Sequence, residues 1–194
     1  LGMAGTAQAT VADNALGDLA IVPYYTVQSN WQTGVHITNT SHYTQVLKFR
    51  MRRAADSADV LDINIILSPY DVWVGNIDDS SGTLTLTTSD TSCTAPASLN
   101  GDGVFPAPDI FIDGAEEGYI EIIGMGSPGA YAGPSAAGND ATNPMSVSAV
   151  HVGGVPLDCN GVRSNFFVST VLSNAVTAQG SAIAGMTGTN TYNE

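Results

Sequence analysis

The stretch TQVLKFRMRR (44–53), followed by VLDINIIL (60–67), decides the fold. The first segment alternates between an apolar face and a basic face, formed by Leu47, Phe49 and Met51 and by Lys48, Arg50 and Arg52 respectively. A hairpin that turns near residues 54–58 sets the basic row beside Asp62 of the second segment. This pattern predicts two antiparallel strands with one buried face.

Further short segments of strand character surround this hairpin. They cover residues 19–28, 31–38, 72–77, 83–88, 118–124 and 147–152, with weaker signals at 166–172 and near 181–186. Pro23 places the first of them at a sheet edge or a bulge, because proline cannot donate to a ladder. Little in the sequence pattern indicates helices. We expect an all-β protein, an antiparallel β-sandwich of Ig-like or jelly-roll-like type with long loops rich in Gly, Pro and Asp.

The chain divides into an arm and one domain. Residues 1–15 form an N-terminal arm, and residues 16–194 form a single β-sandwich domain. After Cys93 the sequence becomes rich in Pro, Gly, Asp and Ala, so that residues 94–146 are expected to be a loop-rich insertion.

The amino-acid composition limits the classes of partner that the protein is expected to bind. The chain has 194 residues, of which 43% are hydrophobic and 12% charged, and its net charge is −13. Because phosphate neutralisation needs a basic surface, nucleic acid is not an expected partner. No segment is long and apolar enough to span a membrane.

The basic row of Lys48, Arg50 and Arg52 has two interpretations. One is a cross-strand charge ladder with the acidic residues of the next strand. The other is a docking patch for an acidic neighbour, including another copy of this acidic chain.

The N-terminal residues also have two interpretations. LGMAGTAQA (1–9) looks like the end of a signal peptide, with a small-x-small cleavage site at 7–9, which predicts export. Alternatively, residues 4–12 are retained, either simply as an ordered N-terminal arm or as a strand that adds to the sheet edge of a neighbouring copy. In that case the subunit interface includes Ala4, Thr6, Gln8 and Thr10.

The chain holds two cysteines, Cys93 and Cys159. In an exported chain such a pair indicates one disulfide, which here closes a long loop.

No arrangement of residues points to catalysis. There is no nucleophile elbow, and the three histidines lie far apart in the sequence. Glu117, Tyr119 and Glu121 share one strand face, which suits acid–base work on a glycan but is more typical of a solvated polar face. We therefore expect a protein that is not an enzyme.

Calcium is the only metal that the sequence suggests, and no cofactor is expected. Asp102, Asp109 and Asp113 supply oxygen ligands in a loop-rich region, although the closing glutamate of an EF-hand is missing. Aromatic residues form either a sugar-stacking platform or core, namely Tyr24, Tyr25, Trp31, Tyr70 and Trp73.

Several motifs are spread over residues 16–160, namely PYYTV (23–27), WQT (31–33), NTS (39–41), DVLDIN (59–64), LSPYDVW (67–73), SCTAP (92–96), EGYIEI (117–122) and HVGGVPLDC (151–159). With them the chain resembles a group of uncharacterised exported and cell-surface β-sandwich proteins of proteobacteria. The resemblance implies export and pairing of Cys93 with Cys159. The group has no known activity, so the resemblance assigns no activity and no catalytic residues to this chain.

The function expected first is a structural subunit of an extracellular filament or cell-surface assembly built from copies of this chain. A secreted glycan- or calcium-binding module that uses the loops at 94–118 is the first alternative. A secreted glycan hydrolase around Glu117 and Glu121 is the second.

Overall fold

The computed structural model describes residues 19–41, 43–99, 101–126 and 144–166. The main strands are β1 (Leu19–Thr26), β2 (Thr33–Thr38), β3 (Gln45–Arg53), β4 (Asp59–Leu67), β5 (Val72–Asp78) and β9 (Glu117–Gly126). Shorter strands are β6 (Thr85–Thr87), β7 (Cys93–Ala95), β8 (Val104–Pro106), β10 (His151–Val152) and β11 (Val155–Pro156). The helices are α1 (Pro144–Ala149) and α2 (Cys159–Phe166), with 3-10 turns η1 (Gln28–Asn30) and η2 (Asp109–Phe111).

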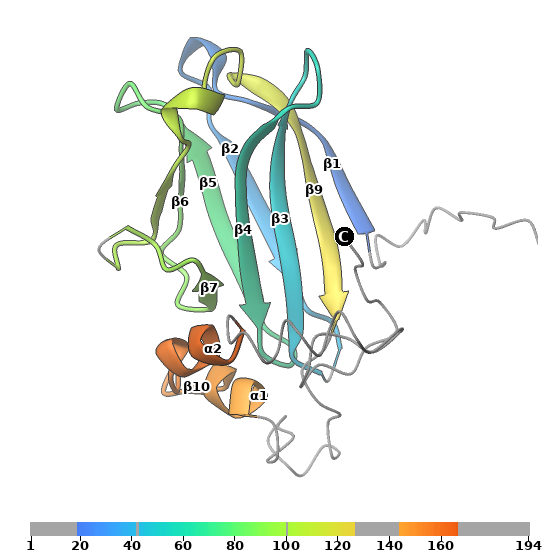
Figure 1. Ribbon diagram of the computed structural model, residues 1–194, viewed down its shortest axis with the longest axis vertical. Coiled ribbons are helices and arrows are strands. Elements are labelled where there is room, and N and C mark those ends of the chain that lie inside the picture. The colour runs from blue at the N-terminus through green and yellow to red at the C-terminus, as the bar shows by residue number, and fades with distance from the viewer. Residues whose placement is uncertain (1–18, 42, 100, 127–143, 167–194) are drawn as a thin grey trace, which may run out of the picture.

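Two antiparallel sheets form the body of the molecule. One sheet has the order β1-β9-β3-β4-β7 and the other β2-β5-β6-β8. Figure 1 shows the long strands of both sheets running the length of the molecule. β10 and β11 form a separate hairpin. The predicted all-β sandwich is confirmed.

The main core lies between the two sheets. Phe49 of β3 meets Trp73 of β5, with ring centroids 5.8 Å apart and planes tilted by 57°. The same cluster includes other fully buried side chains of both sheets, namely Met51, Ile63, Ile65, Leu67, Ile77, Leu86 and Ile120. Burial of this apolar surface is the main force that holds the sheets together.

The β3–β4 hairpin has the predicted register. Phe49 lies opposite Ile63, and Arg50 lies opposite Asp62. Phe49 and Met51 are buried, so the alternation of the sequence separates a core face from an outer face.

The first strand lies where Pro23 predicts it. β1 is the terminal strand of its sheet, and its register with β9 shifts between Val22 and Tyr25. Edge position and bulge are the two settings that tolerate a proline in a strand.

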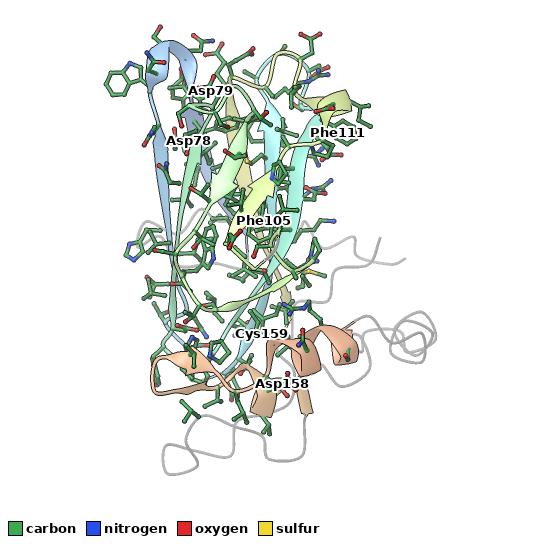
Figure 2. All side chains as sticks on the ribbon, turned by 90° about the vertical axis from the view of Figure 1, so that its left-hand side faces the viewer. Asp78, Asp79, Phe105, Phe111, Asp158 and Cys159 are labelled. Carbon is green, nitrogen blue, oxygen red and sulfur yellow. A yellow bond between two sulfur atoms is a disulfide. The ribbon has the colours of Figure 1, made fainter. Side chains whose placement is uncertain are left out.

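A small helical cap closes one end of the sandwich. In Figure 1, α1, α2 and β10 lie below the lower ends of the long strands. Figure 2 shows Cys159 and Asp158 in this cap, far from Asp78 and Asp79 at the opposite end. The cap and the sheet meet in a second apolar cluster. The cap contributes Met145, Ala149 and Val162, and the sheet contributes Val46, Ile66, Cys93 and Ala95. The disulfide between Cys93 and Cys159 joins β7 to α2 and confirms the predicted bond.

The sequence prediction was wrong in the cap. Residues 147–152 are not one strand, because α1 runs to Ala149 and only His151 and Val152 are extended. Met145 and Ala149, one helical turn apart, both face the second cluster, and this contact favours the helix. Residues 94–118 also hold β8 and η2. The strand predicted at 166–172 begins at Phe166, which is the last residue of α2. The rest of that segment and the strand predicted near 181–186 lie outside the described residues.

Candidate functional site

The free side of β1 is the first candidate for a functional surface. β1 pairs with β9 on one side, and no described residue pairs with it on the other. Leu19 is 58% exposed and Ile21 is 57% exposed, and no residue of β1 is charged. An exposed, uncharged apolar edge is a ready template for pairing with another chain.

β9 holds this edge in place. Leu19 lies opposite Ile123, and Ile21 lies opposite Glu121. The usable part of the edge is short, because Pro23 lacks an amide hydrogen and the bulge after Val22 interrupts the ladder. The open edge therefore consists of residues 19–22.

The basic row of β3 forms an ionic ladder on the outer face of the same sheet. Lys48 Nζ lies 3.7 Å from Asp62, and Arg50 Nε lies 3.3 Å from Asp62. Arg50 Nη2 also lies 3.1 Å from Asp59. These distances confirm the cross-strand ladder.

The ladder continues across three strands. Arg52 of β3 reaches Asp59 of β4 at 2.6 Å and Glu121 of β9 at 3.1 Å. Partial burial lowers the pKa of Arg50, but the carboxylates of Asp62 and Asp59 outweigh it, and the net shift is upward. The cations are thus matched within the fold, and a docking role for Lys48, Arg50 and Arg52 stays a prediction.

The other predicted interface residues are Ala4, Thr6, Gln8 and Thr10. They lie outside the described residues.

The structure does not bring the predicted calcium ligands together. Asp102 lies in the turn before β8, whereas Asp109 begins η2 and Asp113 follows it. Within the described ranges, no group of three or more His, Cys, Asp or Glu side chains could hold a metal ion.

The two glutamates of β9 have separate partners. Glu121 is ion-paired with Arg52, and Glu117 accepts a hydrogen bond from the Tyr24 hydroxyl at 3.1 Å. The first contact ties Glu121 into the ladder, and the second holds Glu117 beside an exposed aromatic ring. A hydrolytic role for this pair stays a prediction.

The aromatic residues divide into core and surface. Tyr25 and Trp73 are fully buried, whereas Tyr24, Trp31 and Tyr70 are more than half exposed. The hydroxyl of Tyr25 donates to the carbonyl of Ala115 at 3.0 Å. Burial, with a smaller effect of the nearby Glu116 carboxylate, raises the pKa of Tyr25.

A cluster that the sequence did not predict joins the cap to the sandwich. His151 Nδ1 lies 3.1 Å from Ser68 Oγ and 3.5 Å from Asp71 Oδ2. Ser68 donates to the same carboxylate oxygen at 3.1 Å. On the other side of the ring, Thr91 Oγ1 lies 3.4 Å from Nε2.

This cluster does not have the geometry of a catalytic triad. In a triad the nucleophile and the carboxylate lie on opposite nitrogens of the histidine. Here Ser68 and Asp71 both lie on Nδ1, and Thr91 donates its proton to the carbonyl of Gly154 at 2.9 Å. The contacts instead tie the β10–β11 hairpin to the turn between β4 and β5.

A hollow of about 420 Å³ opens beside this cluster. Phe105 and Cys159, both labelled in Figure 2, contribute to its wall. Most of its lining bears hydroxyl or charged groups, namely Thr88, Ser89, Asp90, Thr91, Ser92, Thr94, Ser98, Asp102 and Arg163. Arg163 is held by the carbonyl of Thr94 at 3.1 Å and by Asn160 at 2.7 Å.

Sequence reasoning missed this cluster because its members are distant in the chain. His151 lies 83 residues from Ser68 and 60 from Thr91. The only local signal is the turn 68–71, which reads as a break between strands rather than as part of a site.

No helix in the described part of the chain is both long and apolar enough to cross a membrane. Comparisons of the chain with protein-family models, curated proteins and solved structures give no match.

Proposed function

We propose that this protein is exported and is a structural subunit of an extracellular filament or cell-surface assembly, joined by strand addition between copies. The observation that carries the proposal is the open, uncharged and apolar edge of β1 in a chain of net charge −13. The role is structural rather than catalytic.

The chemistry of the edge fits a strand from another copy. Residues 19–22 offer backbone groups that an incoming strand pairs with, as in β-augmentation. Leu19 and Ile21 are each more than half exposed, and covering them would contribute about 1 kcal/mol each. The incoming strand in this proposal is residues 4–12, which are small, uncharged and compatible with an extended chain.

Export is supported by the disulfide between Cys93 and Cys159. Structural disulfides form and persist in oxidising compartments and are rare in the reducing cytosol.

The test compares assembly of four purified proteins by sedimentation velocity and negative-stain microscopy. They are the wild type, a variant lacking residues 1–12, Ile21→Lys and Val152→Lys. Val152 is a matched control because it is 60% exposed in β10, away from the β1 edge. We expect polymers of the wild type and of Val152→Lys, and single subunits of the other two.

Two results contradict the proposal. Single subunits in every sample would refute assembly itself. Polymers that survive Ile21→Lys would show that the β1 edge is not the contact.

A further inference from the structure

The corner between β1 and β2 carries two exposed aromatic rings over a hollow. Trp31 is 68% exposed and Tyr24 is 56% exposed. Together with Thr26, Gln28 and Ser29 they line an open hollow of about 460 Å³. Exposed apolar side chains that share one patch, rather than lying singly, are the surface feature that marks a binding site.

The corner is rigid because its flanks are anchored in the sandwich. Val27 is buried, and its amide donates to the carbonyl of Glu116 at 2.8 Å. Thr33 closes the corner, since its hydroxyl accepts from the Thr26 amide at 3.0 Å and donates to the Thr26 carbonyl at 2.9 Å. Such anchoring lowers the entropy lost when a ligand binds.

The backbone at the corner is held in an unusual conformation. Ser29 has φ of 55° and Asn30 has φ of 63°, so that two successive residues other than glycine are left-handed just before Trp31. For Ser29 this costs about 1–2 kcal/mol, whereas asparagine adopts the conformation more readily, and strained conformations cluster at functional sites. They bring the chain out of the turn with the indole directed to solvent.

The lining of the hollow decides the class of ligand. Its members are aromatic or polar, and none of the five is aliphatic. A sugar ring presents an apolar face of C–H groups and a rim of hydroxyls, which match an aromatic face beside amide and hydroxyl groups.

The charge at the corner points to a neutral sugar. Glu117 accepts a hydrogen bond from Tyr24 at 3.1 Å, and this carboxylate would repel an acidic glycan. We propose that the corner formed by Tyr24, Gln28 and Trp31 is a binding site for a neutral glycan. This site is separate from the open edge of residues 19–22 and does not depend on assembly.

The test is retardation in native gels that contain a neutral polysaccharide, namely a β-glucan, a mannan, a xylan or a galactan, with polygalacturonate as the acidic comparison. Titration calorimetry with the matching oligosaccharide then gives the affinity. Trp31→Ala should weaken binding at least tenfold, because the stacking surface is lost. Tyr70→Ala is the matched control, since Tyr70 is 67% exposed elsewhere.

Fluorescence gives a second readout. Trp31 is exposed and Trp73 is fully buried, so that a blue shift on adding sugar reports Trp31. The shift should be absent in Trp31→Ala.

Three results would overturn the proposal. The first is no retardation by any of the neutral polysaccharides, and the second is unchanged affinity in Trp31→Ala. The third is self-association that is lost in Trp31→Ala while no glycan binds, which would assign the corner to a protein contact.

Discussion

Removal of the disulfide tests how the cap is joined to the sandwich. The bond between Cys93 and Cys159 closes a loop of 66 residues. The loop-closure entropy for that length corresponds to about 4 kcal/mol at 25 °C. For a chain of this size, such a loss lowers Tm by roughly 8–16 °C. We therefore expect this fall in the variant in which Cys93→Ala and Cys159→Ala are combined.

The fall in Tm is measured by thermal unfolding, and the loss of about 4 kcal/mol by urea unfolding followed at two places. Fluorescence of the buried Trp73 reports the sandwich, and hydrogen exchange of residues 144–166 reports the cap. The reduced wild type is the control and should match the double variant. Equal stability of oxidised and reduced wild type would refute the reasoning. Faster exchange in the cap with an unchanged Trp73 transition would also refute it, because the cross-link would then stabilise the cap alone.

Three further predictions concern the sandwich. Gly75→Ala should lower the free energy of unfolding by about 1–3 kcal/mol in a urea titration, because the new Cβ would clash with the Trp73 ring. Gly34→Ala is the control. No atom lies within 4 Å of its new Cβ, so it should change that free energy by less than about 1 kcal/mol. The raised pKa of Tyr25 stabilises the fold at pH values below the ordinary tyrosine pKa of 10.0, and this stability is lost as the pH rises beyond it. Between pH 8 and 12, Tm should therefore fall less steeply with pH in Tyr25→Phe than in the wild type. Equal slopes of Tm against pH would argue against this pKa shift. Arg50→Met should lower stability by about 1–3 kcal/mol, since Asp59 keeps only Arg52 and Asp62 keeps only Lys48 as a cationic partner. Arg53→Met, which breaks the exposed pair with Asp56, should cost less than about 1 kcal/mol, and equal losses in thermal denaturation would contradict the ladder.

The parts of the fold that follow a local pattern could be predicted from the sequence. The alternation through Phe49 and Arg50 gives the β3–β4 hairpin with its ladder, because a period of two separates the faces of a strand. Pro23 marks the edge strand, because a missing amide is tolerated only there or at a bulge. The disulfide follows from the number of cysteines and the expectation of export.

The cap could not be predicted because its helices are short and depend on distant contacts. α1 has six residues and α2 has eight, too few for a helical period to stand out. Contacts between Met145, Val162 and the sheet hold them in place, and a short sequence window does not contain these contacts.

Local sequence patterns also could not predict which aromatic side chains are exposed at the corner between β1 and β2. Tyr24 and Tyr25 are neighbours of identical chemistry, yet one is exposed and the other fully buried. The bulge between Val22 and Tyr25 adjoins both, and its position depends on pairing with β9.

The ionic ladder gives the molecule an uneven distribution of charge. The four basic side chains of β3 are matched by Asp56, Asp59, Asp62 and Glu121. The entire net charge of −13 therefore belongs to the remainder of the chain. Beside a surface of fixed negative charge, the protein should experience less repulsion at the outer face of β3 and β4 than over the rest of the chain. Its orientation would then be set by long-range repulsion before any specific contact is made.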